Sequence, residues 1–91
     1  MLSDPLTTRF DLRAEPSPGL LPRILQPFAK RNVTPDFFQA RHGIEEMEIS
    51  IACQDLEPGV AALIAGNLGQ VIGVSRIVVT PAERLNRQQA G

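Results

Sequence analysis

Apolar and polar side chains follow strand-like patterns in four segments of the chain. Alternation is strict over residues 8–14 and again over 47–53, which is typical of strands with one buried face. Residues 74–80 are rich in β-branched side chains and predict a final strand. Residues 34–42 lead through a turn at Gly43 into 47–53, so these two segments predict a hairpin.

Two further segments carry apolar residues at helical spacing. A first helix starting at about Leu20 places Pro22 in the first turn, where proline is tolerated. Pro27 then falls in mid-helix, and we expect a bend there. Asn32 is a candidate for a left-handed residue at the end of this helix. The apolar residues that define the first helix are Leu20, Leu21, Ile24, Leu25 and Phe28.

The second helix follows a start signal at residues 55–59 and is predicted to end near Gly69. We expect it to be amphipathic, with one apolar face formed by Val60, Leu63, Ile64, Leu68 and Val71.

The predicted order is strand, helix, strand, strand, helix, strand. This order is typical of the α+β ferredoxin-like βαββαβ arrangement, in which two helices cover one face of a four-stranded antiparallel sheet. We expect the domain to span residues 7–80, after an N-terminal arm at 1–6. The tail at 81–91 is polar, without apolar periodicity, and is predicted to be disordered in the absence of a partner.

Composition narrows the classes of partner. The net charge is −1 with scattered basic residues, and there are four Phe but no Trp or Tyr, so no nucleic-acid surface is predicted. No apolar stretch approaches the roughly 20 residues of a membrane-spanning helix, and no membrane partner is predicted. The single Cys53 forms no intrachain disulfide, and the first ten residues lack a signal-peptide pattern, so we expect a cytoplasmic protein.

The residues that carry chemistry do not assemble into a catalytic pattern. One cysteine is too few for a metallochaperone, and His42 is the only imidazole, predicted to be exposed at the hairpin turn. Cys53 is in phase with the apolar side of its strand and is predicted to be buried and inert. Glu45, Glu46 and Glu48 are predicted to be solvated, so we expect no metal and no cofactor.

The connection between the first strand and the first helix resembles that of ACT domains. The resemblance rests on Gly19-Leu20-Leu21-Pro22-Arg23-Ile24 and on Phe28-Ala29-Lys30-Arg31-Asn32-Val33, and it continues through Asn67-Leu68-Gly69-Gln70-Val71-Ile72-Gly73-Val74. Within that family the chain is most similar to the small regulatory subunit of acetolactate synthase. The resemblance implies a non-catalytic regulatory protein that senses a branched-chain amino acid.

The resemblance also implies an effector site at the start of the first helix, and we assign it to Ser17, Gly19, Leu20, Leu21 and Thr34. The first amides of a helix have no internal partner and attract a carboxylate, while a neighbouring subunit would hold the ammonium group of the effector. The chain departs from the family at Pro16, where an amide side chain is frequent, and at Thr34, where Asn is frequent. The residue pattern alone favours a plain turn at Gly19 over a ligand loop, and the resemblance makes the two interpretations equal.

Three functions therefore remain open. The chain is a regulatory subunit on a large catalytic enzyme, a free-standing dimer that binds another small metabolite, or an assembly module without a ligand. Phe37 and Phe38 are adjacent and lie on opposite faces of their strand, which favours pairing with a second copy or with a partner. We expect at least a homodimer.

Overall fold

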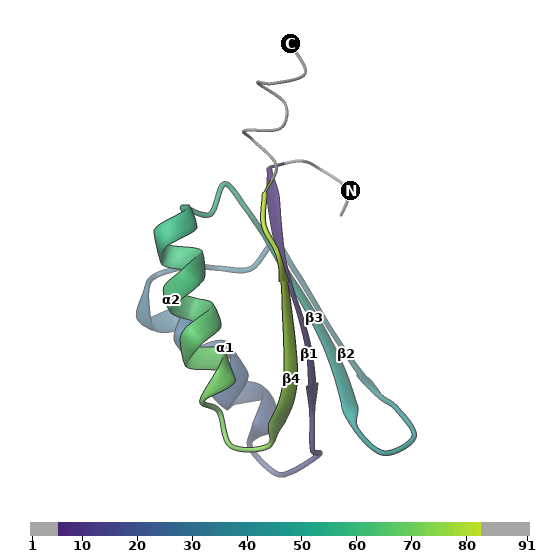
Figure 1. The fold of residues 1–91 in the computed structure, drawn as a ribbon. Helices are drawn as coiled ribbons and strands as arrows, with labels where there is room; N and C mark the ends of the chain where they lie inside the picture. The colour runs from purple at the N-terminus through teal and green to yellow at the C-terminus, as the bar shows by residue number, and fades with distance from the viewer. Residues whose placement is uncertain (1–5, 83–91) are drawn as a thin grey trace.

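The computed structural model describes residues 6–82 and contains the predicted elements in the predicted order. Their bounds are β1 (Thr7–Ala14), α1 (Leu20–Lys30), β2 (Phe37–His42), β3 (Met47–Gln54), α2 (Pro58–Gly69) and β4 (Val74–Thr80). Both helices cover the same face of the sheet (Figure 1). The ferredoxin-like prediction is confirmed.

The four strands pair in the order β2-β3-β1-β4, and all three pairings are antiparallel. The first strand of the chain therefore lies inside the sheet, between β3 and β4. Among the described strands, β2 and β4 form the two edges, and one side of the backbone of each has no strand partner within residues 6–82.

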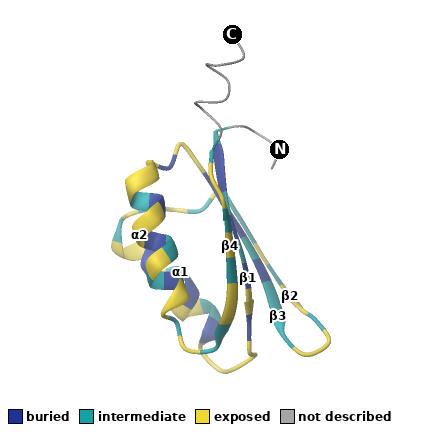
Figure 2. Cartoon of the chain, in the orientation of Figure 1, coloured by how far each residue is buried: buried dark blue, intermediate teal, exposed yellow. Residues whose placement is uncertain are grey.

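The alternation in β1 and β3 separates a helix-facing side from an open side. Phe10, Leu12, Ile49 and Ile51 point toward the helices and are no more than 2% exposed. This buried layer lies between the sheet and the helices (Figure 2). The ring of Phe10 meets the ring of Phe28 from α1 edge to face, with centroids 5.3 Å apart, an arrangement that aromatic pairs favour.

Helix α1 begins where the sequence predicts and continues through Pro27, which is buried. Gly19 precedes the helix with a φ of 77°, in the left-handed region that favours glycine. At the other end Asn32 is also left-handed, with a φ of 57°. The amide of Asn32 donates to the carbonyl of Ala29 and the amide of Val33 to that of Phe28. These bonds form a Schellman motif, and they confirm the left-handed conformation predicted for Asn32.

Helix α2 corrects the expectation of a single apolar face. The helix buries Ala61, Ile64 and Leu68, whereas Leu63 is 57% exposed. No charged residue lies between its first and last positions, so apolar side chains occur on all its sides. Spacing therefore did not reveal which apolar residues face the sheet.

The second strand is shorter than the predicted segment of 34–42, because it begins at Phe37. The carboxylate of Asp36 accepts a hydrogen bond of 2.7 Å from the backbone amide of Gln54, and Asp36 itself donates its amide to Ala52. In register with β3, Phe38 packs against the core and Phe37 lies on the open side. The opposite placement of the two rings is as predicted. The tail beyond residue 82, predicted to be disordered, lies outside the described residues.

Candidate functional site

The loop between β1 and α1 forms the candidate site. All five of its residues, 15–19, are exposed, and Ser17, Pro18 and Gly19 lie directly before the helix. The helix start has no side-chain cap and no acidic residue in its first turn. Helix starts are usually capped by a side-chain oxygen or flanked by a carboxylate, which interact with the free amides and the helix dipole. This end of α1 lacks both.

The amides predicted to bind a carboxylate differ in their availability. The amide of Leu20 donates to the carbonyl of Ser17 over 3.2 Å, so it is already used in the turn. The next intrahelical bond runs from the amide of Arg23 to the carbonyl of Gly19. Pro22 has no amide hydrogen. Within residues 6–82, the amides of Gly19 and Leu21 donate no backbone hydrogen bond.

Arg23 belongs to the same site, although the sequence analysis did not assign it. Its guanidinium donates to the carbonyl of Pro18 over 3.3 Å and to the hydroxyl of Ser17 over 3.2 Å. A Cβ at Gly19 would lie 3.2 Å from Nη1 of Arg23. Arg23 therefore holds the turn and places a cation beside the helix start. The sequence could have suggested Arg23 for this site, because it lies four residues after Gly19 and therefore one helical turn along α1.

The turn between α2 and β4 is a second neighbour of this loop. The amide of Glu15 donates to the carbonyl of Gly73 over 2.9 Å, and Gly73 has a φ of 99°. The two connections lie at the same end of the molecule (Figure 1). Gly73 was not assigned to the site from the sequence, because only the fold brings it next to Glu15.

Thr34 does not lie with the other assigned residues in one protomer. It is exposed and follows the far end of α1, an 11-residue helix of about 16 Å. Ser17, Gly19, Leu20 and Leu21 are at the start of that helix, where Leu20 is buried and Leu21 is partly buried. A site that combines Thr34 with these residues requires a second protomer.

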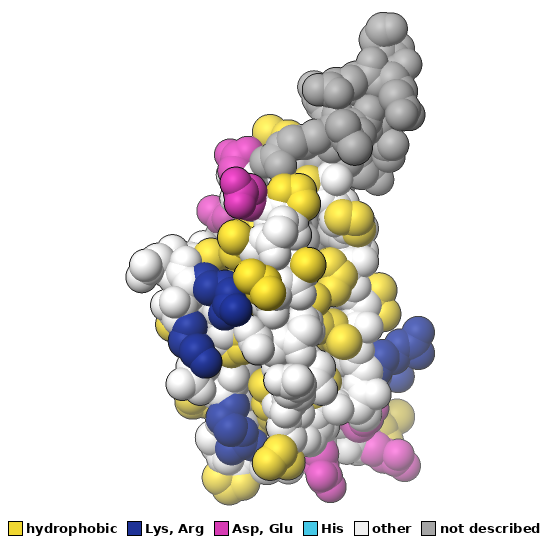
Figure 3. Space-filling view, turned by 60° about the vertical axis from the view of Figure 1, so that its left-hand side comes forward, with side chains coloured by type: hydrophobic (Ala, Val, Ile, Leu, Met, Phe, Trp, Pro, Cys, Tyr) yellow, Lys and Arg dark blue, Asp and Glu magenta, His cyan; other side chains and the backbone are white. Residues whose placement is uncertain are grey.

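The helix layer has a basic surface. The sequence of α1 contains Arg23 and Lys30 but no acidic residue. Basic side chains follow one another along this side of the molecule, and acidic side chains gather at its two ends (Figure 3). Arg23 and Lys30 also line a hollow of about 300 Å³ between the two helices, together with Asn67. An anionic group is therefore attracted to the helix side near the start of α1.

The other residues singled out in the sequence have the expected surroundings. Cys53 is buried, and burial raises the pKa of its thiol to about 11, with a smaller contribution from the Asp36 carboxylate. His42 is exposed, with Nδ1 2.9 Å from the carbonyl oxygen of Gly43. Within residues 6–82 no group of three or more His, Cys, Asp or Glu side chains is placed to hold a metal ion. No helix in this part of the chain is long and apolar enough to cross a membrane.

An apolar hollow of about 670 Å³ lies between α2 and the edge strand β4. Its lining includes Leu56, Pro58, Ala61, Ala65 and Val79. Its volume lies within the range of small-molecule pockets.

Comparison with known proteins gives a family match and a set of similar folds. The sequence matches the ACT-like domain family over residues 3–86. A search of curated proteins finds no match. The sequence match covers most of the chain and includes every helix and strand described above.

Solved structures share the fold at low sequence identity. The ACT domain of GTP pyrophosphokinase from Chlorobium tepidum is similar with a TM-score of 0.71 and 11% identity, over 82% of this chain and 97% of that one. An uncharacterized protein from Thermotoga maritima has a TM-score of 0.68 and 13% identity, over 82% and 94%. The regulatory subunit of aspartate kinase from Thermus thermophilus has a TM-score of 0.63 and 16% identity, over 86% of this chain and 52% of its own.

Proposed function

The chain belongs to the ACT-like domain family, and we propose that it is a regulatory, non-catalytic module that binds a small amino acid. We propose further that it is the small subunit of acetolactate synthase and senses a branched-chain amino acid. The observation that carries the proposal is the uncapped start of α1, where left-handed Gly19 exposes backbone amides beside the Arg23 guanidinium.

The geometry of this start supports recognition of a carboxylate. The amides of Gly19 and Leu21 and the positive end of the α1 dipole attract an anion, and Arg23 adds a full charge. The ammonium group of the same amino acid requires a hydrogen-bond acceptor. Thr34 of a second protomer is our candidate for that acceptor. Thr34 is exposed, and in its own protomer it lies beyond the opposite end of α1 from Gly19.

The sensing role is tested by thermal unfolding with valine, leucine or isoleucine. A ligand that binds only the folded state stabilises it by about 2.7 kcal/mol at a hundredfold excess over its dissociation constant. We therefore expect a rise in melting temperature at millimolar ligand. Gly19→Val should abolish that rise, because the added side chain meets the Arg23 guanidinium and covers the approach to the amides.

Lys30→Gln is a suitable control for this experiment, since it removes one cation from the far end of the same helix. Its response to ligand should equal that of the parent. No rise with any of the three amino acids would favour the assembly module without a ligand. A rise that survives Gly19→Val would place the amino acid elsewhere.

The partner is tested by mixing the protein with the large subunit of acetolactate synthase. Alone, the protein should turn over nothing, and in the mixture it should change turnover or feedback inhibition. Phe37 is the candidate contact, because it lies on the open side of the sheet while Phe38 packs against the core. Burial of an exposed aromatic side chain stabilises a complex by roughly 1.5–3 kcal/mol. Phe37→Asp should abolish the effect, and a folded variant that still regulates the enzyme would show that docking occurs elsewhere.

The apolar hollow between α2 and β4 supports one alternative, a free-standing dimer that binds a less polar metabolite. Ala61 and Ala65 leave space in the wall of this hollow, and Ala65→Phe should fill it. If a metabolite stabilises the parent and not Ala65→Phe, the alternative replaces the amino-acid site. If binding is lost only in Gly19→Val, the site at α1 is retained.

A further inference from the structure

The open side of the sheet has an ordered arrangement of charges that the helix-start site does not use. One row of cross-strand neighbours runs through Arg41, Glu48, Arg13 and Arg76, one residue from each strand. Arg13 is the direct partner of Glu48 on one side and of Arg76 on the other. Side chains of such partners have Cβ atoms about 4.5–5.5 Å apart. Two arginines therefore stand next to each other at one edge of this row.

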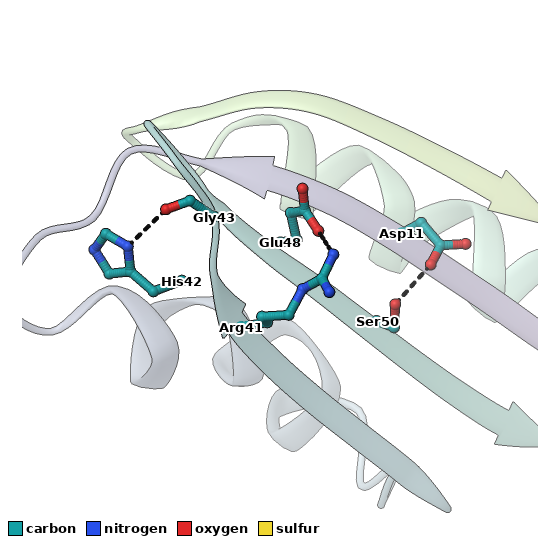
Figure 4. Close-up of polar contacts among 6 residues, drawn as sticks. All are labelled: Asp11, Arg41, His42, Gly43, Glu48 and Ser50. Carbon is teal, nitrogen blue, oxygen red and sulfur yellow. Dashed lines mark hydrogen bonds and ion pairs between the residues drawn. The ribbon is translucent and has the colours of Figure 1, made fainter.

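The three carboxylates near this pair already have partners. Glu46 accepts a hydrogen bond of 2.6 Å from the hydroxyl of Ser75, the residue before Arg76. Glu48 accepts a hydrogen bond from Arg41, which lowers the pKa of Glu48, with a smaller contribution from the Arg13 charge. Asp11, in the next row, accepts hydrogen bonds from Ser50 at 2.8 Å and from Arg9 at 3.0 Å. Figure 4 shows the Arg41–Glu48 and Ser50–Asp11 contacts side by side on β1, β2 and β3.

By contrast, both guanidinium groups of the pair remain without a hydrogen bond or ion pair within residues 6–82. Arg13 and Arg76 are exposed. Like charges directly opposite each other in a sheet destabilise it. The fold thus holds two cations together at a cost, and the nearby carboxylates of Glu46 and Glu48 are hydrogen-bonded to Ser75 and Arg41 rather than to this pair.

The same two arginines line a hollow of about 330 Å³ on the open side. Asp11, Glu48, Ser50 and Val78 also line this hollow, and Val78 is 44% exposed. The two arginines therefore share it with two carboxylates, which are already hydrogen-bonded to Ser50 and Arg41. Such a volume lies at the small end of the range for ligand pockets. The geometry points to a second binding site, in which Arg13 and Arg76 hold the phosphate group of a small molecule. Two adjacent guanidinium groups match a doubly charged tetrahedral group and donate several hydrogen bonds to it.

The charge of this face also argues against a second copy as its occupant. The outward side chains of the strands include Arg9, Arg13, Arg41 and Arg76 with Asp11 and Glu48 as acids, and Glu46 reaches Ser75 at the edge of this face. One positive charge is left on this face of a chain whose net charge is −1. Two such faces would repel each other, whereas a phosphate is attracted.

The site is tested by titrating the protein with inorganic phosphate at constant ionic strength, monitored by amide NMR shifts. We expect saturable shifts centred on residues 11–13 and 76–78. Arg13→Gln and Arg76→Gln should each weaken binding by about tenfold, because each removes charge-assisted hydrogen bonds. Lys30→Gln removes a cation from α1, which covers the other face of the sheet. This variant should bind phosphate as the parent does.

Succinate and chloride form the comparison arms. Binding of succinate with the same residues and affinity would overturn the assignment to phosphate. Shifts that rise linearly with every salt, or that are unchanged in Arg76→Gln, would show an adventitious ion only and overturn the site. Thermal unfolding gives a second measurement. Without phosphate, Arg76→Gln should melt higher than the parent because the like-charge contact is gone, and phosphate should raise the melting temperature of the parent only.

Discussion

Cys53 shows how the position of one residue in the pleat determines its chemistry. Its side chain points into the helix-facing side of β3 together with Ile49 and Ile51, and it is 1% exposed. A thiol in such surroundings remains protonated at neutral pH and is a poor nucleophile. The sequence predicted this burial because the alternation in 47–53 extends without interruption to Cys53.

The raised pKa of Cys53 makes stability dependent on pH in the alkaline range. The ordinary value is 9.0 and burial raises the pKa to about 11. Between about pH 9 and 11 the unfolded chain therefore binds fewer protons than the folded protein, and the free energy of unfolding should fall by up to about 2 kcal/mol. Below about pH 9 the thiol should have no such effect. Urea unfolding at pH 8 and 10.5 measures the difference.

Cys53→Ala provides the control, since it has no thiol to ionise. The variant is less stable at every pH because it leaves a small cavity, but its stability should decrease less between pH 8 and 10.5. An equal decrease in both proteins would assign the alkaline loss to other groups.

Gly19 is the residue at which the backbone itself limits substitution. Its φ of 77° lies in the left-handed region, and a Cβ there would meet Arg23 at 3.2 Å. Gly19→Ala should lower the free energy of unfolding by about 1 kcal/mol. The measurement is urea unfolding at neutral pH. An unchanged midpoint would mean that the loop relaxes to another conformation without cost.

At the scale of the elements, α2 is the helix whose sequence and environment agree least. It contains no charge, it exposes Leu63, and Gly59, Gly66 and Gly69 lie on its exposed side. A Cβ at Gly66 would meet nothing within 4 Å. Packing within the described chain therefore does not require glycine there.

Gly66→Ala should raise the free energy of unfolding by about 0.5–1 kcal/mol, because alanine loses less backbone entropy in a helix interior. It is the matched opposite of Gly19→Ala, since both changes add the same methyl group. Urea unfolding of the two variants side by side checks the signs. Destabilisation by Gly66→Ala at protein concentrations that favour association would indicate that another surface packs against α2.

How much the sequence predicts differs between these elements. The bounds of β4 and the start of α1 follow directly from β-branched residues and from Pro22. The exposure of Leu63 did not follow, because apolar residues all round α2 give its spacing no preferred face. Arg23 at the candidate site was near in sequence but unassigned. Gly73 lies next to Glu15, and Arg13 next to Arg76, because of the strand order and register of the sheet, and local sequence patterns do not contain this information.

At the scale of the whole molecule, the two edges of the sheet within residues 6–82 favour association. We expect at least a dimer by sedimentation at about 100 µM, the weak end for such interfaces. The proposed effector site depends on this association, because Thr34 and Gly19 lie at opposite ends of α1 and can combine only across two protomers. A monomer at that concentration would count against the two-protomer site and leave the Arg13–Arg76 hollow unaffected.

The position of β1 inside the sheet also has a consequence for synthesis. Residues 7–14 leave the ribosome before the rest of the described domain, yet one of their two strand partners, β4, ends only at Thr80. Until that strand has emerged, the nascent chain has an unpaired edge at β1 and lacks Ile77 and Val79 over its apolar layer. Such edges are templates for aggregation. Folding of the domain is therefore completed only after β4 has emerged, and chains interrupted before residue 74 should require a chaperone or be degraded.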